Sequence, residues 1–191
     1  LIRLLCCSLG LWLLTACSST VAPAYYVLSL PGDQAPSRQV TTGPMLVVDR
    51  VQLPEYLNDL GIAFQQDDVQ VVTANQARWA EALDKQLTRS LVLSLSRQLQ
   101  QVQVLEGEGA NDNSWHLSVN ITAFQGRFDG QAIVAGRWIL RRDELTYSQS
   151  FQREIPLGED GYPALVRALR EGWQAEVVQL AQELQPTLTA K

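Results

Sequence analysis

Apolar and polar residues alternate with a period of two in several segments of the chain, and this pattern predicts β-strands. In the first part of the chain, the apolar runs are separated by Pro, Gly and Asp residues, which favour turns. Asp67 and Asp68 join two such runs, so we expect a short hairpin there. The predicted strands of this part are residues 25–30, 45–53, 62–66 and 69–73, with a loop over 31–44.

The period changes to that of a helix after residue 73. Trp79 begins a series of apolar residues that recurs every four positions, as expected for one face of a long amphipathic helix. Thr73 and Gln76 have the spacing of a capping box, so we predict that the helix begins there and that Trp79 anchors it in the core. The apolar stripe comprises Trp79, Leu83, Leu87, Leu91, Leu95 and Leu99.

Alternation returns at Ser114 and predicts a meander of three strands. Asp129-Gly130 predicts a type I′ hairpin after the first of them, and residues 141–144 predict the turn after the second. An apolar stripe after Asp160 predicts a second helix that stops near Pro186. The remaining predictions are a strand at 102–105, a loop at 107–113, strands at 131–140 and 145–155, and one apolar face formed by Trp115, Leu117, Val119, Ile121 and Ala123.

These elements together predict an α+β fold. We expect a mostly antiparallel mixed sheet with two long amphipathic helices packed on one face. The other face of the sheet is more polar, because His116, Ser118, Asn120 and Thr122 alternate with the apolar residues of their strand. We expect this second face to be available to a partner.

The first fourteen residues are typical of an export signal. Arg3 is followed by an uncharged apolar run of eleven residues. A transmembrane helix needs about 20 apolar residues, whereas the hydrophobic part of a secretory signal needs only about 7–15. We therefore predict a signal peptide over residues 1–16 and export of the rest of the chain.

Residues Leu14-Thr15-Ala16-Cys17 resemble the bacterial lipobox. The resemblance implies cleavage before Cys17, an S-diacylglycerol group on its thiol and an N-palmitoyl group on its amine. Ser18 stands where aspartate would favour the inner membrane, so the same resemblance implies the outer membrane. Residues 17–24 would then be the lipidated cysteine and a short tether, and 25–191 a single periplasmic domain. The alternative is a plain signal peptide in which Cys17 is incidental.

Composition excludes several other classes of protein. The chain is 46% hydrophobic with a net charge of −5, which does not fit intrinsic disorder. Its three cysteines all lie in the first seventeen residues, so disulfides or a cysteine-rich zinc site do not hold the fold together. The chain has only two lysines, which argues against a nucleic-acid-binding surface.

Candidate catalytic and metal-binding residues are few. The sequence contains none of the common hydrolase, metalloprotease, P-loop or dinucleotide-binding motifs. His116 is the only histidine, and we interpret it as a solvated strand residue, the alternative being a catalytic base. Asp67 and Asp68 are interpreted as turn residues, the alternative being a metal site. We therefore expect no catalytic residues, no metal and no cofactor.

Two groups of residues are candidates for a partner interface. Arg137 and Arg141 point the same way from one strand, where they could bind anionic lipid or a partner, or could simply be solvated. Pro54 ends a predicted strand, so the apolar Tyr56 and Leu57 after it must either fold back on the core or meet another chain. The sequence leaves both questions open.

The lipobox, the run Tyr25-Tyr26-Val-Leu, the run from Leu53 to Leu57, and Trp79-Ala80-Glu81-x-Leu83 together resemble the family of ABC-type transport auxiliary lipoproteins. The resemblance covers essentially the whole mature chain. It implies a non-enzymatic outer-membrane lipoprotein that faces the periplasm, forms a homo-oligomeric ring, and docks the MCE-domain tunnel protein of a lipid transport system. Such a protein would support membrane integrity, and phospholipid could be a ligand. The alternatives are a lipid-binding carrier lipoprotein, with an acyl chain between sheet and helices, and a lipoprotein hydrolase that uses His116.

Overall fold

The computed structural model describes residues 22–28, 43–107 and 113–190. The predicted signal peptide, Cys17, and most of the loop predicted at 31–44 lie outside these residues. The elements are β1 (Ala24–Tyr26), β2 (Met45–Val48), the 3-10 helix η2 (Glu55–Leu57), β3 (Gly61–Gln65), β4 (Val71–Trp79), α2 (Leu83–Gln98), β5 (Gln103–Glu106), β6 (Trp115–Arg127), β7 (Gln131–Arg142), β8 (Leu145–Pro156) and α3 (Tyr162–Thr189).

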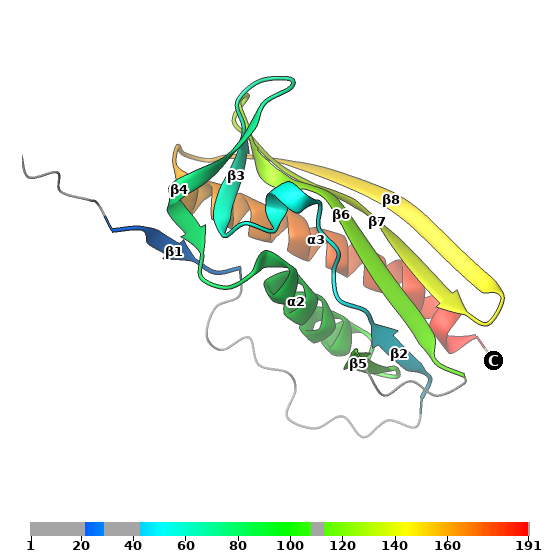
Figure 1. Ribbon diagram of the computed structural model, residues 1–191. Coiled ribbons are helices and arrows are strands. Elements are labelled where there is room, and N and C mark those ends of the chain that lie inside the picture. Colours follow the sequence, from blue (N-terminus) through cyan, green and yellow to red (C-terminus); the bar gives the residue numbers. More distant parts are fainter. Residues whose placement is uncertain (1–21, 29–42, 108–112, 191) are drawn as a thin grey trace, which may run out of the picture.

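The strands form one mixed sheet around β6. On one side of β6, the long antiparallel ladders β6–β7 and β7–β8 make up the predicted meander. On the other side, β2 and β3 follow one another along β6, both parallel to it, and they carry β5 and the β4–β1 pair respectively. Figure 1 shows the three long strands running diagonally across the molecule.

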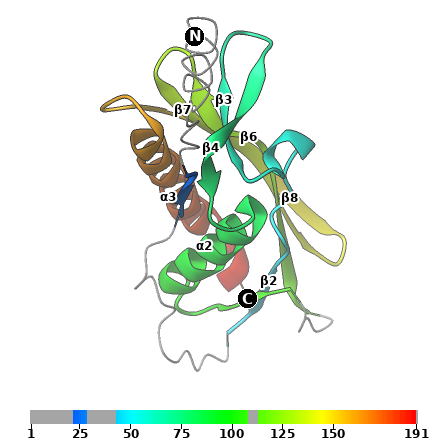
Figure 2. The ribbon, with the colours of Figure 1, turned by 60° about the vertical axis from the view of Figure 1, so that its left-hand side comes forward.

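Both helices lie on the same face of this sheet, as the sequence predicts (Figures 1 and 2). The apolar stripe from Leu83 to Leu99 is buried, which confirms the four-residue period as a core-facing surface of α2. Each fully buried leucine contributes roughly 1.5–3 kcal/mol relative to an exposed one. Trp115, Leu117, Val119 and Ile121 of β6 are buried beneath the helices, and the alternating His116, Ser118 and Asn120 are only partly buried on the opposite face.

The predicted start of the first helix is wrong. Thr73 and Gln76 belong to β4, which continues to Trp79, and α2 begins only at Leu83. Residues 73–79 are strand because β1 and β3 pair with them, and the Trp79 amide donates to the Leu60 carbonyl. Residues held in a strand cannot also cap a helix. Trp79 is nonetheless a core residue, at 1% exposure, and its ring lies against Phe124.

Both hairpin turns differ from the prediction. A type I′ turn needs positive φ at two central residues, but among residues 128–130 only Gly130 has one, at 78°. Arg127 pairs with Gln131 around a three-residue loop, closed by the Gly130 amide donating to the Arg127 carbonyl over 3.0 Å. The second turn is shorter than predicted, since Arg141 and Arg142 belong to β7 and only residues 143–144 connect it to β8.

Two element boundaries and the phase of one strand also differ from the prediction. A bulge between Ile121 and Ala123 shifts the alternation of β6, so Phe124 rather than Ala123 is buried. The strand predicted over 45–53 keeps only its first four residues, and a single bridge from Gln52 to Asn120 follows. The last helix continues past Pro186 to Thr189, because proline costs it one hydrogen bond in its final turn while Leu188 is still buried.

Candidate functional site

The predicted lipidation site lies just before the first described residues. Cys17 itself is outside them, and the chain enters the sheet at β1, whose three residues pair in parallel with residues 77–79 of β4. Fully extended, the chain from Cys17 to Ala22 reaches at most about 18 Å. An anchor at Cys17 would therefore hold the β1 end of the domain close to a membrane.

The segment from Pro54 to Leu57 folds back on its own domain. Leu57 is buried in the core at 2% exposure. The Tyr56 hydroxyl lies 2.8 Å from Gln125 Oε1 and 3.1 Å from the Thr122 carbonyl oxygen, and partial burial raises the pKa of this tyrosine. Pro54 and Tyr56 keep part of their surface accessible, so they are the members of this segment that a partner could touch.

Arg137 and Arg141 lie on the face of the sheet without helices, four residues apart along β7. They are exposed and stand opposite Asn120 and His116 of β6, respectively. Arg137 Nε donates to Ser150 Oγ at 3.4 Å, and within the described residues neither arginine forms an ion pair with a carboxylate. A guanidinium in this state is available for a phosphate or a carboxylate.

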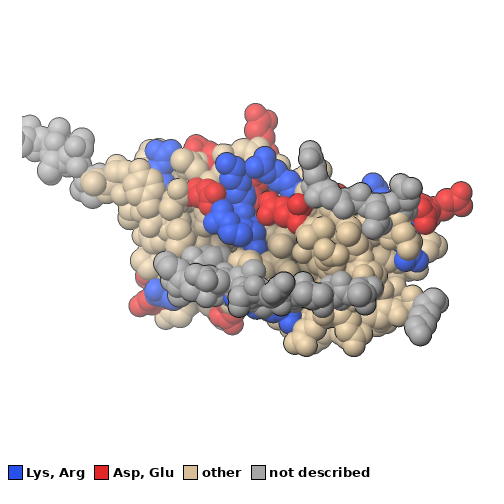
Figure 3. Space-filling view, turned by 90° about the horizontal axis from the view of Figure 1, so that it is seen from below, with Lys and Arg blue, Asp and Glu red and all other residues tan. Residues whose placement is uncertain are grey.

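Other arginines are neutralised locally. Figure 3 shows Lys and Arg side chains adjoining Asp and Glu side chains on another face of the molecule. Two pairs at α2 illustrate this: Arg89 contacts Glu81 at 2.5 Å, and Arg50 contacts Asp84 at 3.1 Å. The positive charge at residues 137 and 141 is therefore a local feature of a chain that is acidic as a whole.

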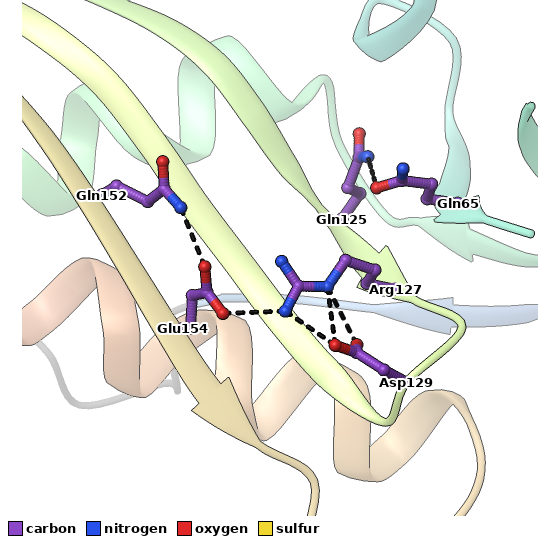
Figure 4. A network of polar contacts seen from close by, with 6 residues as sticks. All are labelled: Gln65, Gln125, Arg127, Asp129, Gln152 and Glu154. Carbon is purple, nitrogen blue, oxygen red and sulfur yellow. Dashed lines mark hydrogen bonds and ion pairs between the residues drawn. The ribbon is translucent and has the colours of Figure 1, made fainter. Parts of the chain in front are cut away.

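Arg127 illustrates the same neutralisation on the open face of the sheet (Figure 4). Its guanidinium contacts Asp129 and Glu154, each at 2.7 Å, and these hydrogen bonds raise its pKa. The same contacts hold the pKa of both carboxyl groups below the usual range. Gln152 donates to Glu154 over 2.8 Å and extends the network along β8. This network joins β6, the β6–β7 turn and β8, and its two carboxylates neutralise the charge of Arg127.

His116 lines a polar cleft of about 450 Å³. Ser118 Oγ donates to Asp49 Oδ2 at 2.5 Å, so its hydroxyl proton points to a carboxylate rather than to the imidazole. Arg142, at the end of β7, stacks on the Trp115 ring at 4.2 Å. The cleft is lined by Asp49, Ser114, His116, Ser118, Arg141, Arg142 and Asp143.

Asp67 and Asp68 form the turn predicted between β3 and β4. Asp67 Oδ1 accepts hydrogen bonds from the amides of Val69 and Gln70, as in a side-chain-closed turn. Across the described parts of the chain, no three His, Cys, Asp or Glu side chains gather as metal ligands. None of the described helices is both long and apolar enough to cross a bilayer.

Comparison with known proteins identifies the family. A sequence model described as "ABC-type transport auxiliary lipoprotein component" matches residues 26–181, from β1 well into α3. The chain belongs to this family. The resemblance noted from the lipobox, the residues around Pro54 and the Trp79 segment is thereby confirmed at the level of the family.

Known relatives of this auxiliary lipoprotein match most of its length. The intermembrane transport lipoproteins PqiC of Escherichia coli K12 and Shigella flexneri are each 34% identical over 175 residues, which is 92% of this chain and 93% of theirs. A crystal structure of an uncharacterized protein has 32% identity and a TM-score of 0.76, covering 86% of this chain and 99% of its own. A protein from Xanthomonas campestris shares the fold at a TM-score of 0.66 with 16% identity, over 87% and 95% of the two chains.

An apolar cleft of the auxiliary lipoprotein is not predicted by its sequence. It has a volume of about 360 Å³ and lies where the β6–β7 turn meets the start of α3. The only sequence signal was Phe128, a large apolar residue placed in a turn, where it is 56% exposed. The lining residues are Phe64, Arg127, Phe128, Gly130, Leu157, Asp160, Gly161, Tyr162 and Leu165.

Proposed function

We propose that this auxiliary lipoprotein is the outer-membrane subunit of an MCE-type intermembrane lipid transport system. It docks the periplasm-spanning tunnel protein at the outer membrane and thereby supports membrane integrity. The observation that carries the proposal is the similarity, over most of its length, to PqiC, which is named as an intermembrane transport lipoprotein. The lipobox at residues 14–17 supports attachment through S-diacylglycerol and N-palmitoyl groups on Cys17.

The open face of the sheet is the surface that we assign to docking. Arg137 and Arg141 place two unpaired cations there, so the complementary surface of the MCE protein should be acidic. Pro54 and Tyr56 lie near the same face, because the Tyr56 hydroxyl contacts Thr122 and Gln125 of β6. Leu57 supports this surface indirectly, because its buried side chain fixes the segment to the core.

We also propose that the subunit forms a homo-oligomeric ring. β8 supports this, because within the described sheet it pairs only with β7 and leaves its outer edge open. Residues 145–152 contain neither charge nor proline, the features that usually protect such an edge. Native mass measurements in detergent, with and without the MCE partner, would detect the ring, and a purely monomeric mass in both conditions would contradict it.

A pull-down with matched variants tests the docking face. The double substitution Arg137→Ala with Arg141→Ala should lower the affinity for the MCE protein by about tenfold, since it removes the two free charges. Arg167→Ala is the control, because Arg167 lies on α3 and pairs with Glu159. Failure of the intact lipoprotein to recover any MCE protein, while a control envelope complex survives extraction, would refute the docking role.

We infer that this role is not catalytic. The family is described as a transport auxiliary component, and the Ser118 hydroxyl in the polar cleft donates to Asp49 rather than to His116. His116→Ala should therefore leave envelope integrity unchanged in a detergent-sensitivity assay. Loss of integrity with an unchanged amount of folded, membrane-bound protein and unchanged recovery of the MCE protein would favour the hydrolase alternative.

A further inference from the structure

The apolar cleft at the β6–β7 turn has the form of a ligand site. Its walls come from four separate parts of the chain: Phe64 of β3, Phe128 of the turn, Leu157 after β8, and Tyr162 and Leu165 of α3. Its volume of about 360 Å³ falls within the roughly 300–1,000 Å³ of typical small-molecule pockets. Large apolar side chains line it, and Arg127 and Asp160 are its charged members.

The cleft is preformed by backbone and packing contacts. The Leu157 amide donates to the Gly130 carbonyl over 2.9 Å, which ties the segment after β8 to the β6–β7 turn. At Gly126, an added Cβ would lie 2.7 Å from Phe64 Cδ2 and 3.0 Å from Leu165 Cδ2. The floor is therefore closely packed, and a ligand would enter an existing hollow rather than open one.

The positive charge at the rim is already neutralised. Arg127 is held by Asp129 and Glu154, so it offers no unpaired cation to a bound anion. Asp160 adds a negative charge to the lining. This combination disfavours an anionic group inside the cleft and favours an apolar chain whose polar end remains in solvent.

Two strongly exposed apolar side chains lie at the same end of the molecule. Phe128 is 56% exposed beside the cleft, and Val69 at the tip of the β3–β4 hairpin is 87% exposed. Figures 1 and 2 show both turns at one end of the sheet. β1 pairs with residues 77–79, at the end of β4 away from the β3–β4 turn, and Arg170 in the first half of α3 donates to the Val27 carbonyl over 3.2 Å. The described residues begin at Ala22, and the chain from Cys17 to Ala22 can span at most about 18 Å.

From these observations we propose that the cleft binds one acyl chain of a membrane lipid. The proposal rests on the proposed function in one respect, that attachment at the membrane brings lipid to this end. It adds a specific binding place to that function. The interior between helices and sheet is filled by core side chains such as Leu169 and Trp173, so the acyl chain lies at the end of the sheet rather than inside.

Photo-crosslinking of the full chain in cells tests the proposal. Phe128→p-benzoylphenylalanine replaces one aromatic side chain with a photoreactive one beside the cleft. After irradiation, the intact mass of the purified lipoprotein should increase by the mass of a phospholipid. The same photoreactive residue at position 178 is the control. It lies on the exposed side of α3 and does not line the cleft, so it should acquire at least about tenfold less lipid.

A second substitution blocks the cleft. Leu157→Trp in the chain that carries the photoreactive residue 128 should lower the lipid adduct about tenfold, because the indole fills the space of the chain. Val178→Trp is the matched control and should leave the adduct unchanged. The thermal unfolding midpoint of each variant shows whether it is folded, and Phe64→Trp serves as the blocking variant if Leu157→Trp is not.

Four outcomes would overturn the proposal. They are the absence of any adduct at residue 128, an adduct with protein in place of lipid, an equal lipid adduct at residue 178, and an adduct that folded blocking variants do not reduce. Recovery of the MCE protein is measured on the same samples. Loss of that recovery with the lipid adduct intact would refute docking and leave the acyl site standing.

Discussion

At the scale of single residues, the Tyr56 hydroxyl holds the segment between β2 and β3 against β6. It contacts Gln125 Oε1 at 2.8 Å, and Gln125 is itself buried at 6% exposure. Tyr56→Phe keeps the ring but removes the hydroxyl that donates to this buried acceptor. We therefore expect the free energy of unfolding to fall by about 0.5–1.5 kcal/mol. Urea unfolding would measure this change.

Tyr147→Phe is the control for that substitution. Tyr147 is 43% exposed and packs against Trp115 through its ring, which the variant retains. Its unfolding free energy should stay within about 0.5 kcal/mol of the wild type. Equal effects at residues 56 and 147 would show that the Tyr56 hydroxyl contributes nothing specific to the fold.

Glu176 gives the protein a measurable dependence on pH. Burial is the main cause that raises the pKa of this carboxyl above 4.5, and the hydrogen bond from Arg153, at 2.8 Å, opposes it only in part. An acid with a raised folded pKa contributes stability below its unfolded pKa and loses it as pH rises through the folded pKa.

Glu176→Gln stays neutral at every pH and isolates this effect. The difference in unfolding free energy, variant minus wild type, should therefore be more positive at about pH 8 than at about pH 4. Denaturant unfolding at both pH values would measure it. A constant difference would mean that the Glu176 pKa is the same in the folded and unfolded chain.

At the scale of elements, the three long strands pack closely around Gly136. An added Cβ at this residue would lie 2.4 Å from the backbone carbonyl oxygen of Asn120 and 2.8 Å from Phe151 Cζ. Backbone cannot rotate aside as a side chain can, so Gly136→Ala should destabilise the fold by about 1–3 kcal/mol. Thermal or urea unfolding would show the loss.

The matched control is Gly158→Ala in the connection from β8 to α3. An added Cβ there has no heavy atom within 4 Å, and its effect should remain within about 0.5 kcal/mol. A Gly136→Ala variant as stable as this control would mean that β6 and β7 can separate slightly without cost.

Those elements that depend on local periodicity were predictable from the sequence. The leucine stripe of α2 and the alternation of β6 follow from burying one face, and the structure buries the predicted leucines and, up to the bulge, the predicted residues of β6. The ends of the elements depend on distant partners. Residues 73–79 are strand because β1 and β3 pair with them, and the phase of β6 changes at a bulge that forms only against β7.

The candidate sites also divide into one that local sequence spacing predicts and one that depends on distant strand pairing. Arg137 and Arg141 are four positions apart in one strand, so their common face is evident from the sequence. The apolar cleft is not evident, because Phe64 reaches it only through the pairing of β3 with residues 126 and 127 of β6. A site whose walls come from four elements requires the topology of the whole sheet.

At the scale of the whole molecule, two candidate surfaces lie at different positions along the long strands. The exposed Val69 and Phe128 and the apolar cleft lie at the end with the β3–β4 and β6–β7 turns (Figure 1). The free cations Arg137 and Arg141 lie further along β7, on the face without helices. This arrangement would let one subunit contact a membrane at its end and a protein partner on its face at the same time.

The anchor gives the last prediction. Cys17 precedes β1, the first described strand, which begins at Ala24, so Cys17→Ser should abolish acylation and leave the fold intact. The variant should lose outer-membrane fractionation, yet unfold at the same temperature as the lipidated protein. Cys7→Ser is the control, because residue 7 lies in the predicted signal peptide, and it should keep both the acyl mass and the membrane fraction. Intact-mass spectrometry with membrane fractionation measures these results, and an acylated, outer-membrane Cys17→Ser protein would refute the lipobox.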